Sequence, residues 1–301
     1  MFALYSPIIG NMSIAGQPIL DVASGIGLRH ELSLRGLQFA SRHGYLFELS
    51  DGQAPSIIFG RDEAGRPGNF HPDAYRRICA NEQWARRLEK VHTAYKRSRL
   101  RSNWQWKELD CSNSSDALLM NIFCHPNALS GSAVQALLGI ESRAVPEFGF
   151  KPRTPLQNGR RDNTEIDMKI GELLVEAKLT ESDFQSASPG LISRYRDLEA
   201  VFDVSELPAR TGKGCGYQLI RGALAAYATE YSFCVFCDAR RPELVERWYR
   251  IMRAVRHFEL RCRLKLLTWQ ELAFVLPKDL QQFLSAKYGI FPAASRRIAS
   301  G

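Results

Sequence analysis

The hydrophobic pattern between residues 164 and 179 predicts a β-hairpin. Apolar and polar residues alternate over 164–170, as in a strand with one buried face. Residues 173–179 are apolar at all but two positions, as in a strand buried on both sides. Gly171-Glu172 fits a two-residue turn with glycine in its first position. This turn pairs the strands antiparallel, with Ile170 opposite Leu173.

The register predicts a cluster of charged side chains on one face of the hairpin. Asp167 falls opposite Glu176, and Glu165 falls opposite Lys178, with about 5 Å between the Cβ atoms of each pair. Two facing carboxylates repel each other unless a cation lies between them. Mg²⁺ takes oxygen ligands of this kind, and Lys178 would then contact a phosphate or help to activate a water. The alternative is a solvated hairpin with ordinary Glu–Lys pairing, but buried charges without a role are rare.

Beyond the hairpin, the pattern predicts helices packed on a mixed sheet. A helix over 217–231 leads to a buried strand over 233–237, and strand–helix–strand order after a hairpin indicates such a sheet. Residues 1–60 are poorly periodic apart from two short strands. The other expected elements are strands at 45–49, 56–59 and 264–267 and helices at 74–79, 81–97, 117–123, 133–140, 242–258, 269–276 and 278–288.

Composition narrows the class of protein and its surroundings. Of the 301 residues, 45% are hydrophobic and 24% charged, as in a soluble globular protein, and no apolar run approaches the ~20 residues of a membrane span. Seven scattered cysteines, an odd number, argue against a disulfide framework and for a reducing, cytoplasmic compartment. Cys234 and Cys237 share one predicted strand and would point to opposite faces, so we do not expect them to bind one metal.

Basic residues indicate a polyanionic partner. The net charge is +8, and arginine and lysine recur on the helices expected at 81–97 and 242–258. Such a helix face is either solvated or contacts phosphates without regard to base sequence. Arg221 shares a helix face with Gln218, three residues earlier. The candidate nucleic-acid contacts are Arg86, Arg87, Lys90, Arg221, Arg247 and Arg250.

The order of these elements resembles the PD-(D/E)xK nuclease superfamily. The matching motif is Glu165-Ile166-Asp167, eight residues, and Glu176-Ala177-Lys178, followed by a helix with Gln218 and a strand. The resemblance covers about residues 113–240. Within the superfamily, residues 113–121 and 217–221 are similar to a bacterial restriction-endonuclease-like group. Ile166 stands where a proline is usual before the first acid.

This resemblance implies an α+β fold in which helices flank a mixed central β-sheet, with an N-terminal extension. It also implies a metal-dependent nuclease that hydrolyses phosphodiester bonds, in DNA more than in RNA. Asp167, Glu176 and the Ala177 carbonyl would hold Mg²⁺, for which Mn²⁺ would substitute. Lys178 would orient or deprotonate the attacking water, and Gln218 would help to position the site.

Several choices stay open. The upstream helix often supplies a further acid, for which Asp116, Asn121 and Glu141 are candidates. Residues 111–301 would form the catalytic domain, and residues 1–110 would serve recognition or packing. Rival hypotheses are a nucleic-acid-binding protein that keeps the nuclease fold without cleaving, and an unrelated basic interaction protein with a charged hairpin. No membrane partner is expected, and nothing in the sequence indicates or excludes a homodimer.

Overall fold

A mixed five-stranded sheet lies at the centre of the fold, in the order β12-β11-β7-β6-β3. The structure is a computed structural model that describes residues 19–50, 55–63, 65–91 and 107–292. Strand β7 pairs in parallel with β11, which pairs in parallel with β12, whereas β6 is antiparallel to both β7 and β3. The strands are β3 (Pro146–Phe150), β6 (Ile166–Ile170), β7 (Leu173–Ala177), β11 (Ser232–Cys237) and β12 (Leu264–Thr268).

The predicted hairpin is β6–β7, in the predicted register. Ile170 pairs with Leu173 and Met168 pairs with Val175, across a turn in which Gly171 has φ +56°. A positive φ suits glycine, which has no Cβ to clash. All residues of β7 are buried, as the sequence indicated. The ladder with β6 ends at the Met168–Val175 pair, so neither predicted opposition, of Asp167 to Glu176 or of Glu165 to Lys178, is a pair of this ladder.

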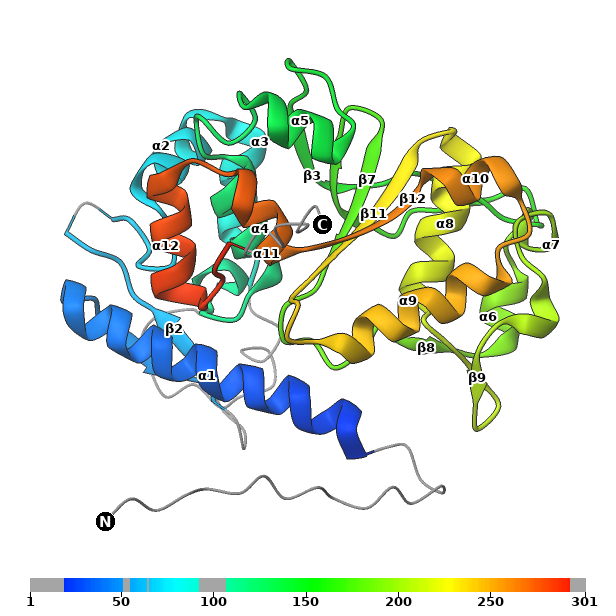
Figure 1. Ribbon diagram of the computed structural model, residues 1–301, viewed down its shortest axis with the longest axis horizontal. Helices are drawn as coiled ribbons and strands as arrows, with labels where there is room; N and C mark the ends of the chain where they lie inside the picture. The colour runs from blue at the N-terminus through cyan, green and yellow to red at the C-terminus, as the bar shows by residue number, and fades with distance from the viewer. Residues whose placement is uncertain (1–18, 51–54, 64, 92–106, 293–301) are drawn as a thin grey trace, which may run out of the picture.

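Helices cover both faces of the sheet, which lies between two hydrophobic cores (Figure 1). One core joins Leu174 and Phe233 to α8 (Tyr217–Thr229), α9 (Pro242–Ala254) and α10 (Phe258–Arg263). The other joins Val175 and Phe236 to α4 (Ser115–Phe123), α5 (Ser132–Leu138), α11 (Trp269–Val275) and α12 (Lys278–Tyr288). Cys237 belongs to the first core and Cys234 to the second, on opposite faces as predicted. The predicted α+β class, with helices flanking a mixed central β-sheet, is therefore confirmed.

Shorter elements complete the described chain. The predicted N-terminal strands are β1 (Phe47–Leu49) and β2 (Ile57–Phe59), which pair antiparallel. The others are α2 (Pro72–Ala80), η2 (Glu108–Asp110), β4 (Thr154–Pro155), β5 (Arg161–Asp162), β8 (Ser186–Ala187), α6 (Pro189–Ser193), α7 (Leu198–Val201), η3 (Val204–Glu206), β9 (Ala209–Arg210) and β10 (Lys213–Cys215).

Two predictions for the N-terminal part are wrong. Helix α1 (Ile19–His43) was not expected. The helix predicted over 81–97 ends early: α3 (Glu82–Ala85) passes into the 3-10 turn η1 (Arg86–Glu89), and Lys90 is extended. The carbonyl of Lys90 accepts a hydrogen bond from Glu108 N, at 2.7 Å, so a distant segment draws the chain out of the helix. Residues 92–106 lie outside the described part.

The N-terminal region packs directly on the rest of the chain. Helix α1 contacts α12, and side chains of α2, α3 and η1 form a small core with Ala117 and Met120 of α4 and with Cys124, which follows α4. The boundary between residues 110 and 111 stays a prediction. Among the described helices, none is both long and apolar enough to cross a membrane.

Candidate functional site

The motif residues meet where β7 ends. Lys178 Nζ lies 2.7 Å from Glu176 Oε1, and only 6% and 2% of these two side chains are exposed. Asp167 Oδ2 accepts a hydrogen bond of 2.7 Å from the N–H of Ala177, which lies just beyond the end of the β6–β7 ladder. The structure therefore gathers two carboxylates, one ammonium and the backbone of Ala177 in one place.

Gln218 joins this cluster from the first turn of α8. Its Nε2 donates to Glu176 Oε1 at 2.6 Å. Its Oε1 is buried and has no hydrogen-bond partner among the described residues. A buried acceptor without a partner costs free energy unless a ligand satisfies it. Carboxylate, carbonyl and amide oxygens are the donor set that Mg²⁺ prefers, so the residues fit such an ion.

The charges in the cluster shift each other's pKa. Burial, followed by the charges of Glu176 and Asp116, raises the pKa of Asp167 well above its usual value, although Lys178 opposes this. Burial alone would lower the pKa of Lys178. The carboxylates of Glu176, Asp167 and Glu181 outweigh it, so the pKa of Lys178 lies above its usual range. Lys178 is therefore an ammonium beside the acids.

Of the three candidates for the upstream acid, the structure brings Asp116 to the site. Asp116 lies in the first turn of α4, close enough to raise the pKa of Asp167. Asn121 is buried and bonded elsewhere: its Oδ1 accepts from His71 N and its Nδ2 donates to the carbonyl of Asn69. Glu141 is exposed in the turn after α5.

Three of the six predicted nucleic-acid contacts border these acids. Arg87 donates to Asp116 and to Glu165, at 3.1 Å each. Lys90 Nζ lies 2.9 Å from Asp116 Oδ2. Arg221 donates to the backbone carbonyl of Glu165 at 3.1 Å. Arg87 therefore lies beside Glu165, where the sequence predicted Lys178.

The other three candidates lie on helix surfaces in ion pairs. Arg86 pairs with Glu82 and Arg250 with Glu246, each one helical turn away. Arg247 lies 3.4 Å from Asp183, in the segment that follows β7. Surface pairs such as those of Arg86 and Arg250 contribute little to stability, so these two cations can exchange their partner for a phosphate at small cost.

Sequence reasoning missed the groups that hold the site in place. Trp269 Nε1 donates to the carbonyl of Lys178 at 2.9 Å, and the buried Arg241 donates to the carbonyls of Leu179 and Glu181. Both come from beyond residue 237, and no local pattern connects them to the hairpin. An Arg-Arg-Pro run before a helix carries no sign that one arginine is fully buried.

A second cluster of possible metal ligands lies away from this site. Nitrogen or oxygen atoms of His71, His125 and Asp279 lie within 4.8 Å of one another. Nδ1 of each histidine accepts a backbone N–H, from Asp73 at 3.2 Å and from Asn127 at 3.4 Å. Each Nε2 then carries the proton, and that of His125 donates to Asp279 at 3.1 Å. This is the arrangement of a hydrogen-bonded pair, because a metal would need the lone pair on Nε2.

Comparison with known proteins gives a family for most of the chain. The model of the family described as restriction endonuclease associating with ARP matches residues 46–289, which include the hairpin, Gln218 and every element of the central sheet. No curated protein matches the chain, and no solved structure matches it. The match spans well over half of the sequence, and the chain therefore belongs to the restriction endonuclease associating with ARP family.

Proposed function

We propose that this protein is a Mg²⁺-dependent nuclease of the PD-(D/E)xK type that hydrolyses phosphodiester bonds in DNA. The observation that carries the proposal is the cluster of Asp167, Glu176, Lys178 and Gln218 at the end of β7, in which Glu176 and Lys178 are buried. Two carboxylates and an ammonium in a buried place cost free energy unless they serve a ligand. A nuclease-like role also agrees with the description of the family.

Each residue has a part in this chemistry. Asp167, Glu176 and the carbonyl of Ala177 would hold the ion, and the orphan Oε1 of Gln218 offers one more oxygen. When bound, Mg²⁺ neutralises charge on the phosphate and lowers the pKa of a water. Lys178, an ammonium hydrogen-bonded to Glu176, orients that water. Asp116 supplies further negative charge from α4.

The cations around the acids suit a polyanionic substrate. Arg87 and Lys90 lie beside Asp116, the buried Arg221 is bonded to the backbone of Glu165, and Arg86, Arg247 and Arg250 extend the positive charge over neighbouring surfaces. Contacts of this kind bind phosphates without reading bases and weaken with salt. DNA is proposed over RNA because the family is named for restriction endonucleases. The same description says that the family associates with ARP, and the free cysteines suit a cytoplasmic setting.

A cleavage assay tests the proposal. Plasmid, linear and single-stranded DNA and RNA are incubated with the protein in Mg²⁺, in Mn²⁺ and in EDTA. We expect DNA cleavage that needs the metal and that falls at least 100-fold in Glu176→Gln and in Lys178→Ala. The matched controls are Glu147→Gln and Lys169→Ala, which break an exposed ion pair of 2.6 Å in the same sheet and should cut normally.

The outcomes separate the rival functions. Cleavage that survives both substitutions at the site contradicts the proposal. Salt-sensitive DNA binding without cleavage in either metal identifies a nucleic-acid-binding protein with a nuclease-like fold. Cleavage of RNA alone keeps the site and corrects the substrate.

A further inference from the structure

The residues that follow β7, Lys178–Gln185, connect the parts of the candidate site, and we call them the exit segment. Resting on the proposed function, we propose that Arg241 is the positioning residue that holds the exit segment in place. Arg241 touches neither the acids nor Gln218. It acts through the backbone to which these residues are attached.

Arg241 is fully buried at the start of α9 and points its hydrogen bonds at the exit segment. Its Nη1 donates to the carbonyl of Leu179 at 3.1 Å and its Nη2 to the carbonyl of Glu181 at 2.9 Å. Its Nε bonds Glu243. A Cβ added at Gly25 of α1 would lie 3.2 Å from Nη2, so the N-terminal helix closes over the guanidinium. A buried cation is costly to maintain, and this one directs two bonds at one short stretch of backbone.

On one side, the exit segment is bonded to α4, which carries Asp116, and to Asn113, just before α4. Asn113 Nδ2 donates to Thr180 Oγ1 at 2.9 Å. Ser115 Oγ donates to Glu181 Oε1 at 2.5 Å, while Glu181 Oε2 accepts from Leu179 N at 2.6 Å. Fixing the exit segment therefore fixes the first turn of α4.

On the other side, the exit segment is bonded to α8, which carries Gln218. The carbonyl of Phe184 accepts from Gln218 N at 3.0 Å, and the carbonyl of Gln185 accepts from Tyr217 N at 3.0 Å. Lys178 itself opens the segment, with its N–H bonded to the carbonyl of Phe236 at 2.8 Å. One segment thus ties together the strand, α4 and α8, and Arg241 is bonded at its middle.

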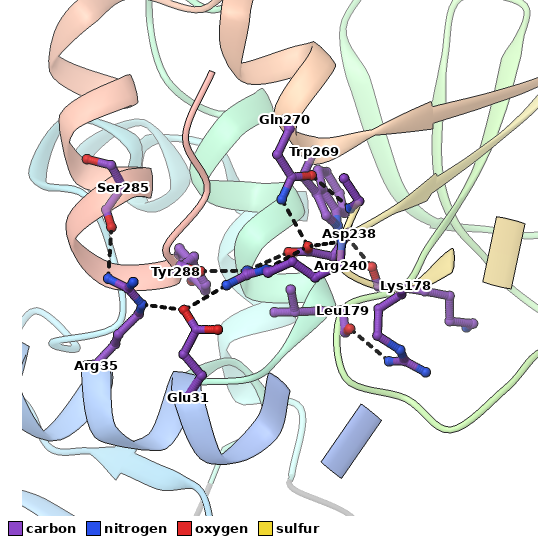
Figure 2. A network of polar contacts seen from close by, with 12 residues as sticks. Glu31, Arg35, Lys178, Leu179, Asp238, Arg240, Trp269, Gln270, Ser285 and Tyr288 are labelled. Atoms are coloured by element: carbon purple, nitrogen blue, oxygen red, sulfur yellow. Dashed lines mark hydrogen bonds and ion pairs between the residues drawn. The ribbon is translucent and has the colours of Figure 1, made fainter. Parts of the chain in front are cut away.

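The adjacent arginine offers a matched control (Figure 2). Arg240 is also held by several bonds: it pairs with Asp238 at 2.7 Å and Glu31 at 2.8 Å and donates to the carbonyl of Tyr288 at 2.9 Å. These bonds lead to α1, to the end of β11 and to α12, away from Gln218. Loss of Arg240 should therefore loosen the fold without moving the exit segment.

The test compares Arg241→Met, Arg241→Lys and Arg240→Met in the full chain. We measure Mn²⁺ binding by calorimetry, amide hydrogen exchange of the exit segment and of Gln218, and urea unfolding. Both Met variants should lose stability. Only the Arg241 variants should weaken Mn²⁺ binding, by about 10-fold or more, as for other groups that orient metal ligands, and speed exchange in the exit segment. Arg241→Lys keeps the positive charge but loses the planar guanidinium that donates two hydrogen bonds. Its Mn²⁺ affinity and exchange rates should therefore lie between those of the parent and of Arg241→Met.

Unchanged Mn²⁺ affinity and exchange in Arg241→Met, or equal changes in Arg240→Met, would overturn the role of Arg241. If Arg241→Met does not fold, the same comparison of Mn²⁺ affinity and exchange is made with Arg241→Lys. If the parent protein cuts nothing and binds no Mn²⁺, the proposed function fails. Faster exchange of the exit segment in the Arg241 variants alone would still establish the positioning role.

Discussion

Lys287, on α12, carries a buried charge far along the chain from the candidate site, and its replacement has a calculable effect on stability. Its side chain is 1% exposed and bonds Asn69 Oδ1. The ammonium lies 4.3 Å from the ring centroid of Phe59 and 4.8 Å from that of Tyr288. Burial lowers the pKa of Lys287 from 10.5 to about 7, with a small opposing effect of Cys111.

The magnitude follows from this pKa. The difference between 10.5 and about 7 corresponds to about 5 kcal/mol, at roughly 1.4 kcal/mol per pH unit, as an upper limit for the cost of burying the ammonium. Contact of the ammonium with the two aromatic rings offsets about 2 kcal/mol of this cost. Between the folded and the unfolded pKa, the unfolded state binds more protons, so the stability of the parent rises with pH. From pH 7 to pH 9 we expect a gain of about 1–2 kcal/mol, and below pH 7 the full cost remains.

The assay is urea unfolding of the parent and of Lys287→Met at pH 7 and pH 9. Methionine keeps the length of the side chain without its charge. At pH 7 the variant should be more stable by about 1–3 kcal/mol, after about 1–2 kcal/mol is lost because Asn69 Oδ1 has no partner. Burial holds the pKa of Cys111 at about 11 and that of Tyr288 above its usual value, so neither ionises by pH 9. A difference between the two proteins that is independent of pH would refute the reasoning.

Three further predictions follow from particular contacts. Asp116→Asn should reduce DNA cleavage by about 10–100-fold, because Asp116 adds charge beside Asp167. The control is Glu141→Gln at an exposed position, which should cleave normally. Equal cleavage rates in the two variants would exclude Asp116 from the site. Lys90→Ala should weaken DNA binding alike for all sequences and should lower the magnitude of the slope of log K, the DNA association constant, against log[salt] by about 1. Fluorescence anisotropy measures this binding. An unchanged slope would mean that Lys90 contacts no phosphate. Gly222→Ala should destabilise the fold by about 1–3 kcal/mol in urea unfolding, because the new Cβ would lie 2.2 Å from the Phe233 ring; a neutral effect would show that α8 can move away from the sheet.

The hairpin was predictable because its evidence is local. A glycine turn sets the register up to Met168 and Val175, and beyond the ladder Asp167 still lies close enough to Glu176 for the charge of Glu176 to raise its pKa. Helix α1 was not predictable in this way. Its buried residues in the described part include Leu28, Leu32 and Ala40, a narrow stripe in a helix that also contains glycines with low helix propensity. This narrow apolar stripe is buried because α1 packs against α12 and β2.

Other features depend on partners distant in sequence. The helix expected over 81–97 is interrupted because Lys90 bonds to Glu108, a contact that no local propensity contains. Asp116 could not be separated from Glu141 by sequence, since both are acids upstream of the hairpin. Asp116 lies beside the site because α4, which contains it, packs against β7. The positions of Arg241 and Trp269 depend in the same way on how the C-terminal half folds over the end of β7.

The end of the β6–β7 ladder explains why the acids lie where they do. Up to Met168 and Val175, the two strands satisfy each other's backbone groups. Two residues beyond Val175, the N–H of Ala177 bonds the carboxylate of Asp167 in place of a strand carbonyl. On its other side β7 stays paired with β11 as far as Ala177, so its direction is kept while its edge toward β6 opens. A hydrogen bond to a carboxylate is stronger than one between neutral groups. The local loss of sheet pairing is thus offset by the bond that fixes Asp167 beside Glu176.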